Sequence, residues 1–273
     1  MKESFRFLKN TLYGKWVVLA PKRARRPDVA AGTEPLCPFC EGQESKTPKE
    51  VYRLGRGRKN APGWQIRVVP NKYRFAPIHE LIIHSPAHDD SFFTYKASYI
   101  AKIFRVYKER YLRWQRKGQV FIFYNHGTSG GESLPHSHTQ LAVVPKQIRL
   151  DTPRAVSPEN IAHEGHYFTI FIPQTSGWPY EVWFLPKERG RYFGETRPEE
   201  IKDLAKVFSR VLKKLQRVLG ADFPFNFYIY PGGDWYLRLI PRVKTPGGFE
   251  IGTGILVNTT DPKQATKKIS WKS

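Results

Sequence analysis

The densest group of chemically reactive side chains in the sequence spans residues 136–140. His136, His138 and Gln140 stand at alternate positions, and the apolar run Leu141–Pro145 follows directly. Because alternate residues of an extended strand point to one face, we expect the two imidazoles and the amide to face a common ligand. One imidazole can attack phosphorus, and the amide can hold a phosphoryl oxygen. The other histidine is then free to orient the loop or to bind a metal ion.

A glycine-rich segment precedes this motif. It runs from Asn125 to Ser133 and includes Gly127, Gly130 and Gly131. Glycine lets the backbone approach an anionic ligand closely, so the segment suits a phosphate group. A single histidine is more often structural than catalytic, and such a loop alone is weak evidence. The glycines, the spacing of the three polar side chains and the strand behind them together favour phosphoryl-transfer chemistry.

The composition is that of a folded protein. The chain has 273 residues, of which 14% are aromatic and 25% charged, enough for one large domain or two of ordinary size. No run of about eighteen apolar residues occurs, so no membrane span is expected. The first residues lack the apolar core of a signal peptide, and we therefore expect a cytoplasmic protein.

The formal net charge of +21 is unusual. Basic proteins attract polyphosphates without regard to sequence, so the charge raises the alternative of a nucleic-acid binding protein built on an inactive enzyme scaffold. Lys and Arg are scattered, however, along the segment 102–116 and the tail 263–272 rather than packed into one arm. We interpret them as a solvated face, and nucleic acid is not the expected partner. A small anionic substrate fits the same charge.

The two halves of the chain follow one plan. Each is predicted to contain a strand, a long amphipathic helix and two further strands, in that order. The expected ranges are 79–84, 100–114, 120–124 and 136–144 in the first half, and 180–186, 201–219, 225–230 and 234–241 in the second.

Only the first half retains the reactive imidazole. When Pro241 is placed on Pro145, Asp234 falls at the position of His138, and Tyr236 at that of Gln140. The pattern predicts an α+β fold of two pseudo-repeated halves, each an antiparallel sheet with a crossover helix. We expect the first half to span residues 1–150 and the second, degenerate half 151–273. Residues 1–65 precede the repeat and are predicted to form an irregular arm.

Cys37 and Cys40 are the only cysteines, and they form a CxxC motif. In a cytoplasmic protein this motif indicates a metal site or a redox pair before a structural disulfide. Two thiolates leave a tetrahedral zinc ion two ligands short. Several histidines are available to complete the site, and spacing alone does not choose among them: His79, His84, His88, His126 and His136.

Taken in order, these motifs resemble the galactose-1-phosphate uridylyltransferase family of the HIT superfamily. The resemblance covers nearly the whole chain and implies a HIT-like fold. Its motifs are the strand and arginine-rich arm at 16–27, CxxC at 37–40, VPNKY at 69–73, SPAH at 85–88 and HxHxQ at 136–140.

The resemblance also implies roles for individual residues. His138 would be the nucleophile that becomes nucleotidylated, and Gln140 would hold the transferred phosphoryl group. The implied zinc ligands are Cys37, Cys40, His88 and His136, and because four protein ligands close the zinc shell, the ion would be structural. The implied contacts with the nucleotide are Arg23 and Arg26 to phosphates, Asn71 to the nucleoside, and Asn125 and Ser133 to phosphate.

The chain departs from the family pattern at three places. Lys72 follows Asn71 where the uridylyltransferases often have an aspartate, and Asp234 and Tyr236 replace a second metal-binding HxH, so no second metal is expected. The closing segment 248–254 lacks the Tyr–Glu pair that grips galactose 1-phosphate, and it is more similar to the ADP-glucose phosphorylase branch.

The resemblance implies a nucleotidyltransferase that acts on nucleoside diphosphate sugars, similar to a UDP-glucose:hexose-1-phosphate uridylyltransferase. A nucleotide sugar and a sugar phosphate or inorganic phosphate would be its small-molecule partners, zinc its cofactor, and a second copy its partner in a homodimer. The alternative is an ADP-glucose or dinucleotide phosphorylase that uses inorganic phosphate.

Overall fold

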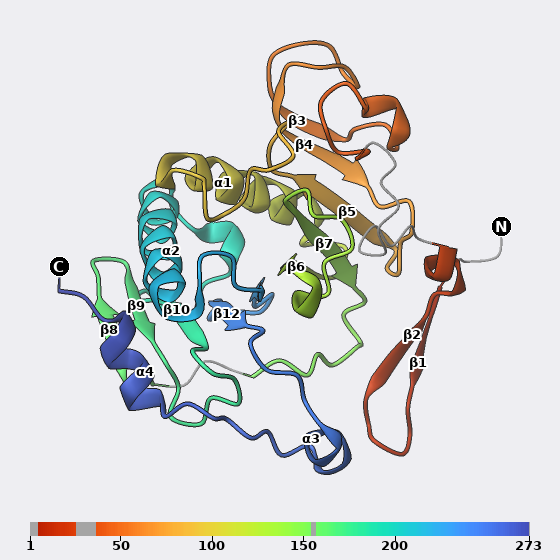
Figure 1. Ribbon diagram of the computed structural model, residues 1–273. Coiled ribbons are helices and arrows are strands. Elements are labelled where there is room, and N and C mark those ends of the chain that lie inside the picture. Colours follow the sequence, from red (N-terminus) through yellow and green to blue (C-terminus); the bar gives the residue numbers. More distant parts are fainter. Residues whose placement is uncertain (1–4, 26–36, 154–156, 273) are drawn as a thin grey trace. The chain divides into compact units, whose positions relative to one another are not determined.

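The computed structural model describes residues 5–25, 37–153 and 157–272 (Figure 1). The contacts divide these residues into two compact units. The first comprises the described residues up to 91 together with 111–122 and 133–153, and the second comprises 92–110, 123–132 and the described residues from 157 onward. The units interleave along the chain, so the repeat boundary at residue 150 stays a prediction.

The first unit is built on a sheet. Its strands lie in the order β3-β4-β5-β7-β6, and pairing from β3 to β7 is antiparallel. Their bounds are β3 Tyr52–Gly55, β4 Trp64–Pro70, β5 Ile78–Ile83, β7 His138–Val144 and β6 Gln119–His126, whose second half belongs to the other unit. The arm predicted to be irregular, residues 1–65, therefore supplies β3 and the start of β4 to this sheet, and it also contains two further strands.

A separate two-stranded hairpin and short 3-10 turns complete the first unit. The hairpin pairs β1 (Arg6–Lys9) with β2 (Trp16–Leu19) in antiparallel register. The 3-10 turns are η1 (Pro21–Arg25) and η3 (Glu44–Lys46).

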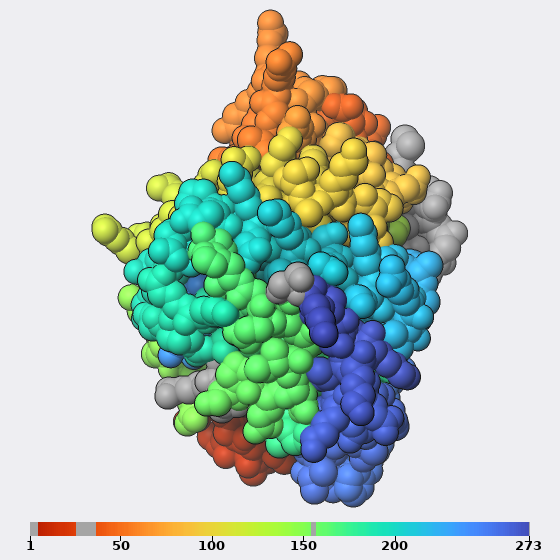
Figure 2. Space-filling model, turned by 90° about the vertical axis from the view of Figure 1, so that its left-hand side faces the viewer, coloured from red at the N-terminus to blue at the C-terminus, as the bar shows by residue number. Residues whose placement is uncertain are grey.

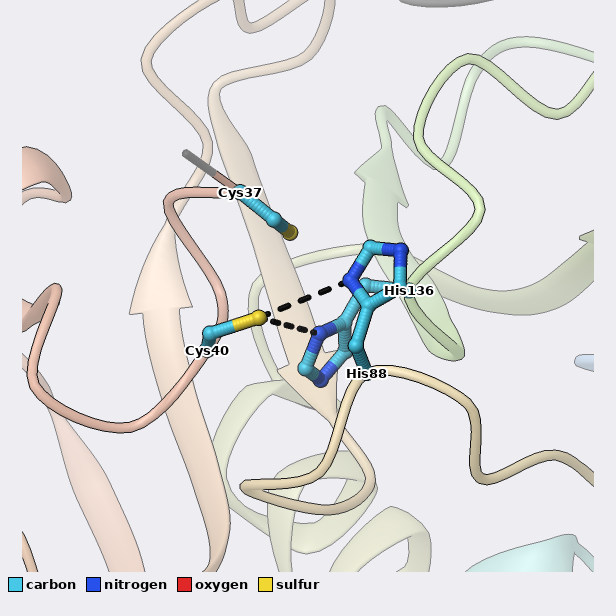
Figure 3. A group of neighbouring side chains, drawn as sticks. All are labelled: Cys37, Cys40, His88 and His136. Atoms are coloured by element: carbon cyan, nitrogen blue, oxygen red, sulfur yellow. Dashed lines mark hydrogen bonds between the residues drawn. The ribbon is translucent and has the colours of Figure 1, made fainter. Parts of the chain in front are cut away.

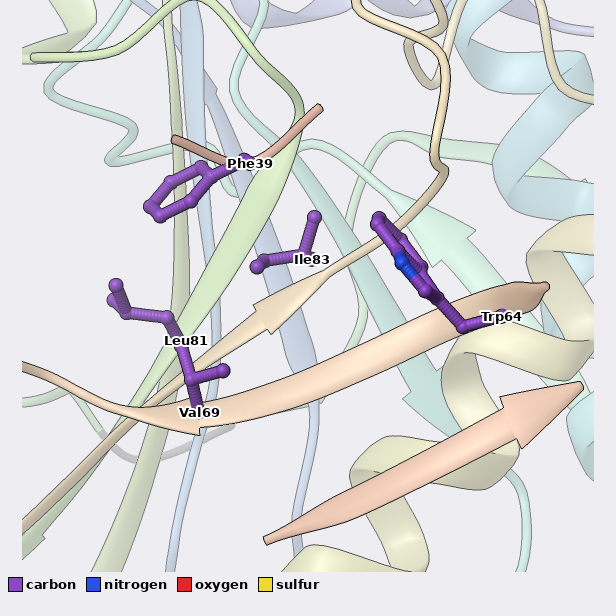
Figure 4. Close-up of a cluster of buried hydrophobic side chains, with 5 residues drawn as sticks. All are labelled: Phe39, Trp64, Val69, Leu81 and Ile83. Atoms are coloured by element: carbon purple, nitrogen blue, oxygen red, sulfur yellow. The ribbon is translucent and has the colours of Figure 1, made fainter. Parts of the chain in front are cut away.

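Strand register places a cluster of apolar side chains on the same face of the first unit's sheet as His138. Ile83 lies opposite His138, and Leu81 lies opposite Gln140. Directly opposed residues of an antiparallel pair share a face, so these four side chains do too. The buried cluster on this side consists of Phe39, Trp64, Val69, Leu81 and Ile83 (Figure 4).

The second unit repeats this strand order. Its strands run β8-β9-β10-β12-β11 and pair antiparallel, matching β3-β4-β5-β7-β6 of the first unit. Their bounds are β8 Ile161–Glu164, β9 Phe168–Phe171, β10 Val182–Pro186, β12 Leu237–Pro241 and β11 Phe225–Ile229. Together with the helix that precedes β11 in the chain, this arrangement confirms the predicted α+β fold with antiparallel pairing.

Two long helices occupy the predicted positions. They are α1 (Ala97–Trp114), whose last four residues belong to the first unit, and α2 (Pro198–Leu219). Leu204, Phe208 and Leu215 of α2 are fully buried, as its apolar stripe requires. The remaining helices are η4 (Thr128–Gly130), η5 (Phe193–Glu195), α3 (Gly248–Thr253) and α4 (Pro262–Ile269). Within the described residues, no helix is long and apolar enough to cross a membrane.

The second unit has replaced polar groups by aromatic packing at the positions that correspond to the HxHxQ motif. Tyr236 is fully buried and stacks on Trp183 and Tyr230, with ring centroids 4.3 and 5.0 Å away. Asp234 has a φ of 62° and accepts hydrogen bonds from the backbone N–H of Gly190 and from Arg189. These hydrogen bonds connect the segment after β10 with the turn before β12.

Candidate active site and metal centre

His138 begins β7 with its imidazole in a defined tautomer. Its Nδ1 lies 2.8 Å from the backbone oxygen of His136, a distance at which Nδ1–H donates to the carbonyl. The lone pair of the ring is then on Nε2, the nitrogen able to attack an electrophile. The residue is only 7% exposed, and the ring of Phe39 packs edge-on against it at 5.1 Å.

Gln140 is held by a histidine from the neighbouring strand. The Nε2 of His79 lies 3.0 Å from Oε1 of Gln140, and the backbone N–H of Phe75 donates to Nδ1 of His79. His79 therefore donates from Nε2 to the amide oxygen of Gln140, whose NH2 group remains the donor end. Asn71 also lies beside this histidine, with its Nδ2 3.2 Å from Nε2 of His79. An amide fixed in this way can donate to a phosphoryl oxygen.

His84 braces the opposite side of the motif. Its Nδ1 lies 2.9 Å from the hydroxyl of Ser137, and its Nε2 lies 2.9 Å from that of Thr139. Alternation along β7 directs these hydroxyls away from the face that carries His138. Burial, with the nearby His138 and His136, keeps the pKa of His84 well below its ordinary value, so the ring is neutral at physiological pH.

Four side chains of the first unit converge on one point (Figure 3). Their donor atoms all lie within 4.8 Å of one another, and they belong to Cys37, Cys40, His88 and His136. The Sγ of Cys40 lies 3.5 Å from Nδ1 of His88 and 3.6 Å from Nδ1 of His136. Ideal tetrahedral zinc, with Zn–S of about 2.3 Å and Zn–N of about 2.0–2.1 Å, sets sulfur and nitrogen ligands about 3.5 Å apart. The residues therefore fit a metal ion.

The protonation states suit metal binding as well. Burial lowers the pKa of His136 to about 4. Its Nε2–H donates to the backbone oxygen of Ser85 at 2.7 Å, which leaves the lone pair on Nδ1, directed at Cys40. Burial raises the pKa of Cys37 to about 11, so that thiol keeps its proton until a metal displaces it.

The other residues expected at the nucleotide are divided between the units. In the first unit, the Arg23 guanidinium donates to the backbone oxygen of Tyr73 at 2.7 Å and lies over the ring of Phe75, which packs on His79. Ser133 of the same unit is buried. Asn125 belongs to the second unit, where its Oδ1 accepts from Asn226. Arg26 lies outside the described residues.

Three side chains of this site were not expected there from the sequence. Phe39 lies inside the CxxC motif, and only folding brings its ring against His138. His79 and His84 were predicted only as candidate metal ligands, whereas they contact Gln140 and the back of β7. The alternation of His79 with Leu81 and Ile83 was the available signal for His79, because it places the imidazole on the face of a strand.

No family model matches the sequence. The chain is 26% identical to ADP-glucose phosphorylase of Arabidopsis thaliana in an alignment that covers 95% of this chain and 90% of that protein. It is 23% identical to galactose-1-phosphate uridylyltransferase of Thermotoga maritima in an alignment that covers 95% of this chain and 96% of that protein. The crystal structure of the Arabidopsis thaliana ADP-glucose phosphorylase with bound ADP-glucose superimposes with a TM-score of 0.78 at 25% identity, over 99% of both chains.

Over nearly its whole length the chain is therefore similar to galactose-1-phosphate uridylyltransferases and ADP-glucose phosphorylases. A uridylyltransferase structure shares the fold at a TM-score of 0.77 and 20% identity, over 96% of each chain. The predicted HIT-like fold is thereby confirmed. The protein is an enzyme similar to these transferases and phosphorylases, and its cysteine–histidine cluster is a possible metal site.

Proposed function

We propose that this enzyme is a nucleoside diphosphate sugar phosphorylase that works through a nucleotidyl-histidine on His138, with ADP-glucose as the first donor to test. One observation carries the proposal. The backbone oxygen of His136 fixes the proton of His138 on Nδ1, so the attacking lone pair is on Nε2, on the same strand face as Gln140. The similarity to an ADP-glucose phosphorylase supports inorganic phosphate as the acceptor.

In the first step, Nε2 of His138 attacks the α-phosphorus of the nucleotide sugar. The N–P bond forms as the bond to the bridging oxygen breaks, and glucose 1-phosphate leaves with the electron pair. A sugar phosphate is a good leaving group, so positioning and charge stabilisation can supply most of the catalysis. The carbonyl of His136 stabilises the positive charge that develops on the imidazole.

In the second step, an oxygen of inorganic phosphate attacks the nucleotidyl phosphorus. The N–P bond breaks, the electron pair returns to Nε2 of His138, and ADP is released. Phosphate itself is the second nucleophile, so no second nucleophilic side chain is needed.

The roles of the surrounding residues follow from their contacts. The NH2 group of Gln140 donates to a non-bridging oxygen, and His79 prevents the amide from turning. Arg23 supplies positive charge for the phosphates beside Asn71, which meets the nucleoside. Arg26, Asn125 and Ser133 are proposed as further phosphate contacts from the family resemblance.

We propose zinc as the metal held by Cys37, Cys40, His88 and His136. Two thiolates and two imidazoles are a ligand set that zinc prefers, and four protein ligands leave no position for a substrate. Bound zinc would tie the CxxC loop to the residue two before the nucleophile. Its contribution is therefore to hold the loop in place.

We also propose that two copies associate. Several apolar side chains are strongly exposed, among them Leu12 at 86% and Tyr13 at 76% in the β1–β2 hairpin and Ile251 at 77% in α3. Exposed apolar groups of this kind are typical of interaction surfaces. Light scattering on the purified protein would give the mass of a dimer, and a monomer at every concentration would contradict this proposal.

Product analysis tests the acceptor. Incubation with ADP-glucose and phosphate is expected to yield ADP and glucose 1-phosphate in equal amounts, with slower turnover of UDP-glucose. If galactose 1-phosphate were the required acceptor and phosphate inert, the enzyme would instead be a uridylyltransferase-type enzyme, and the phosphorylase proposal would be wrong.

A further inference from the structure

The second unit carries a basic hollow on the solvent side of α2. Its volume is about 500 Å³, and no acidic side chain lines it. The lining residues, which we call the α2 basic hollow, are Ala97, Lys206, Ser209, Arg210, Lys213, Lys214 and Arg217. Both α2 and α4 reach the surface in the view of Figure 2, where α2 is cyan to blue and α4 dark blue.

The five cations of the hollow lack the carboxylate partners that other cations of this unit have. Arg191, Arg197 and Arg238, for example, form ion pairs with glutamates. In the part of the chain that the structure describes, none of the five lies within ion-pair distance of a carboxylate. Lys214 donates to the backbone oxygen of Ser270. Arg210 lies over the ring of Trp271, 5.1 Å from its centroid, but within the described residues no carboxylate neutralises any of the five charges.

The spacing of these cations works against the helix itself. Lys206 and Arg210 are four residues apart, as are Arg210 and Lys214, and Lys213 and Arg217. Like charges at this spacing repel one another on a helix surface and destabilise it. The helix C-terminus favours cations in the last turn only, which does not account for Lys206 or Arg210. A bound polyanion would attract each of these cations and offset the repulsion between them.

We propose that the α2 basic hollow binds the phosphate backbone of nucleic acid without reading its sequence. From Lys206 to Arg217 the helix rises about 16 Å. One strand of a duplex presents a phosphate every 3.4 Å or so, which gives about five phosphates over the same length. Ser209 is the only neutral polar side chain of the hollow, and Lys and Arg contacts to phosphate carry no sequence information.

A membrane surface fits this helix less well. Helices that lie in a lipid interface need an apolar face that can enter the bilayer. Leu204, Phe208 and Leu215, on the apolar face of α2, are fully buried in the protein. Ala97 is the only apolar residue among those lining the hollow. The hollow therefore offers positive charge but no apolar side chains that could enter a bilayer.

The salt dependence of binding to a short duplex of random sequence, followed by fluorescence anisotropy, tests the proposal. Five phosphate contacts predict a slope of log K against log salt of about −4.5, and therefore a roughly 500-fold loss of affinity from about 50 to about 200 mM salt. The double variant Lys213→Gln, Arg217→Gln should give a slope of about −2.7 and a roughly 40-fold loss over the same range.

A matched control carries the same change of net charge elsewhere. Arg6 and Lys9 are exposed on β1 of the first unit, so Arg6→Gln, Lys9→Gln should leave the slope close to that of the parent. Equal effects in both double variants, an unchanged slope in the Lys213, Arg217 variant, no measurable duplex binding, or tighter binding to anionic phosphatidylserine vesicles would each overturn the proposal. Nucleotidyl transfer by both variants should equal that of the parent, so the outcome is independent of the proposed function.

Discussion

The cysteine–histidine cluster gives the sharpest quantitative prediction, which concerns the pH dependence of zinc affinity. Cys37 must lose its proton before it can bind zinc, and burial places its pKa at about 11. His136, with a pKa of about 4, is already neutral at pH 7 and releases no proton there. Zinc binding near neutrality is therefore coupled to thiol ionisation and not to His136.

The expected magnitude follows from these values. Because the pKa of Cys37 lies well above 7, the thiol is almost fully protonated at neutral pH, and zinc must displace this proton in order to bind. Because each displaced proton makes binding stronger as pH rises, the zinc affinity should increase at least tenfold from pH 6 to pH 7. Cys37→Ser removes one of the two thiol ligands and should abolish tight zinc binding.

Competition with a chromogenic chelator at several pH values measures this affinity, and metal analysis gives the stoichiometry. The parent should hold about one zinc per chain. Its free energy of unfolding should rise by about 1.4 kcal/mol for each tenfold increase in free zinc, and its thermal midpoint should rise accordingly. His163→Asn changes a histidine outside the cluster and should leave both results unaltered. A zinc affinity that did not vary between pH 6 and pH 8, or a metal-free protein with full stability, would refute the reasoning.

Three further predictions concern the side chains around the nucleophile. His84→Phe removes one buried hydrogen-bond partner from each of two hydroxyls, and unfolding in urea should show a loss of stability of about 2–4 kcal/mol. If the variant shifts β7 by about 1 Å, nucleotidyl transfer should be about 100-fold slower. His79→Leu should lower the rate of nucleotidyl transfer and leave zinc content unchanged; an unchanged rate would mean that Gln140 needs no support. Burial raises the pKa of Glu132 despite the hydrogen bond from the Gly127 N–H, so the fold loses stability as the pH rises above the ordinary value of 4.5; Glu132→Gln should raise the melting temperature at pH 7 and not at pH 3.5.

Motifs that lie close together in the sequence were predicted well. Alternation from His138 to Gln140 places both on one face of a strand because the strand is buried and its register is set by the apolar cluster on that face. The long helices were predictable for a similar reason, since apolar stripes at helical spacing report burial directly.

Features that depend on distant segments were not predictable from the residues alone. Cys40 lies 48 and 96 residues from its histidine neighbours, and only the fold selects His88 and His136 from the available set. The family resemblance pointed to the same four residues, yet their distances come from the structure. The short strand β3 was missed because it has only four residues and none of them is buried.

The positive charge shows the same limit. The sequence presents Lys and Arg as scattered, and the pattern favoured a solvated face. Helical geometry instead brings five cations of α2 to one surface, while carboxylates pair with cations elsewhere in the unit. Counting charges along the chain does not reveal which of them lack partners.

The most direct test of the account is the intact mass of the protein after mixing with ADP-glucose and removal of free nucleotide. The parent and His166→Asn, a variant of an exposed histidine in the second unit, should each gain the mass of one AMP. His138→Asn should gain nothing while keeping its zinc and its melting temperature, and added phosphate should release ADP from the parent adduct. An adduct on the His138→Asn variant, or turnover of ADP-glucose by that variant, would contradict the assignment of His138 as the nucleophile.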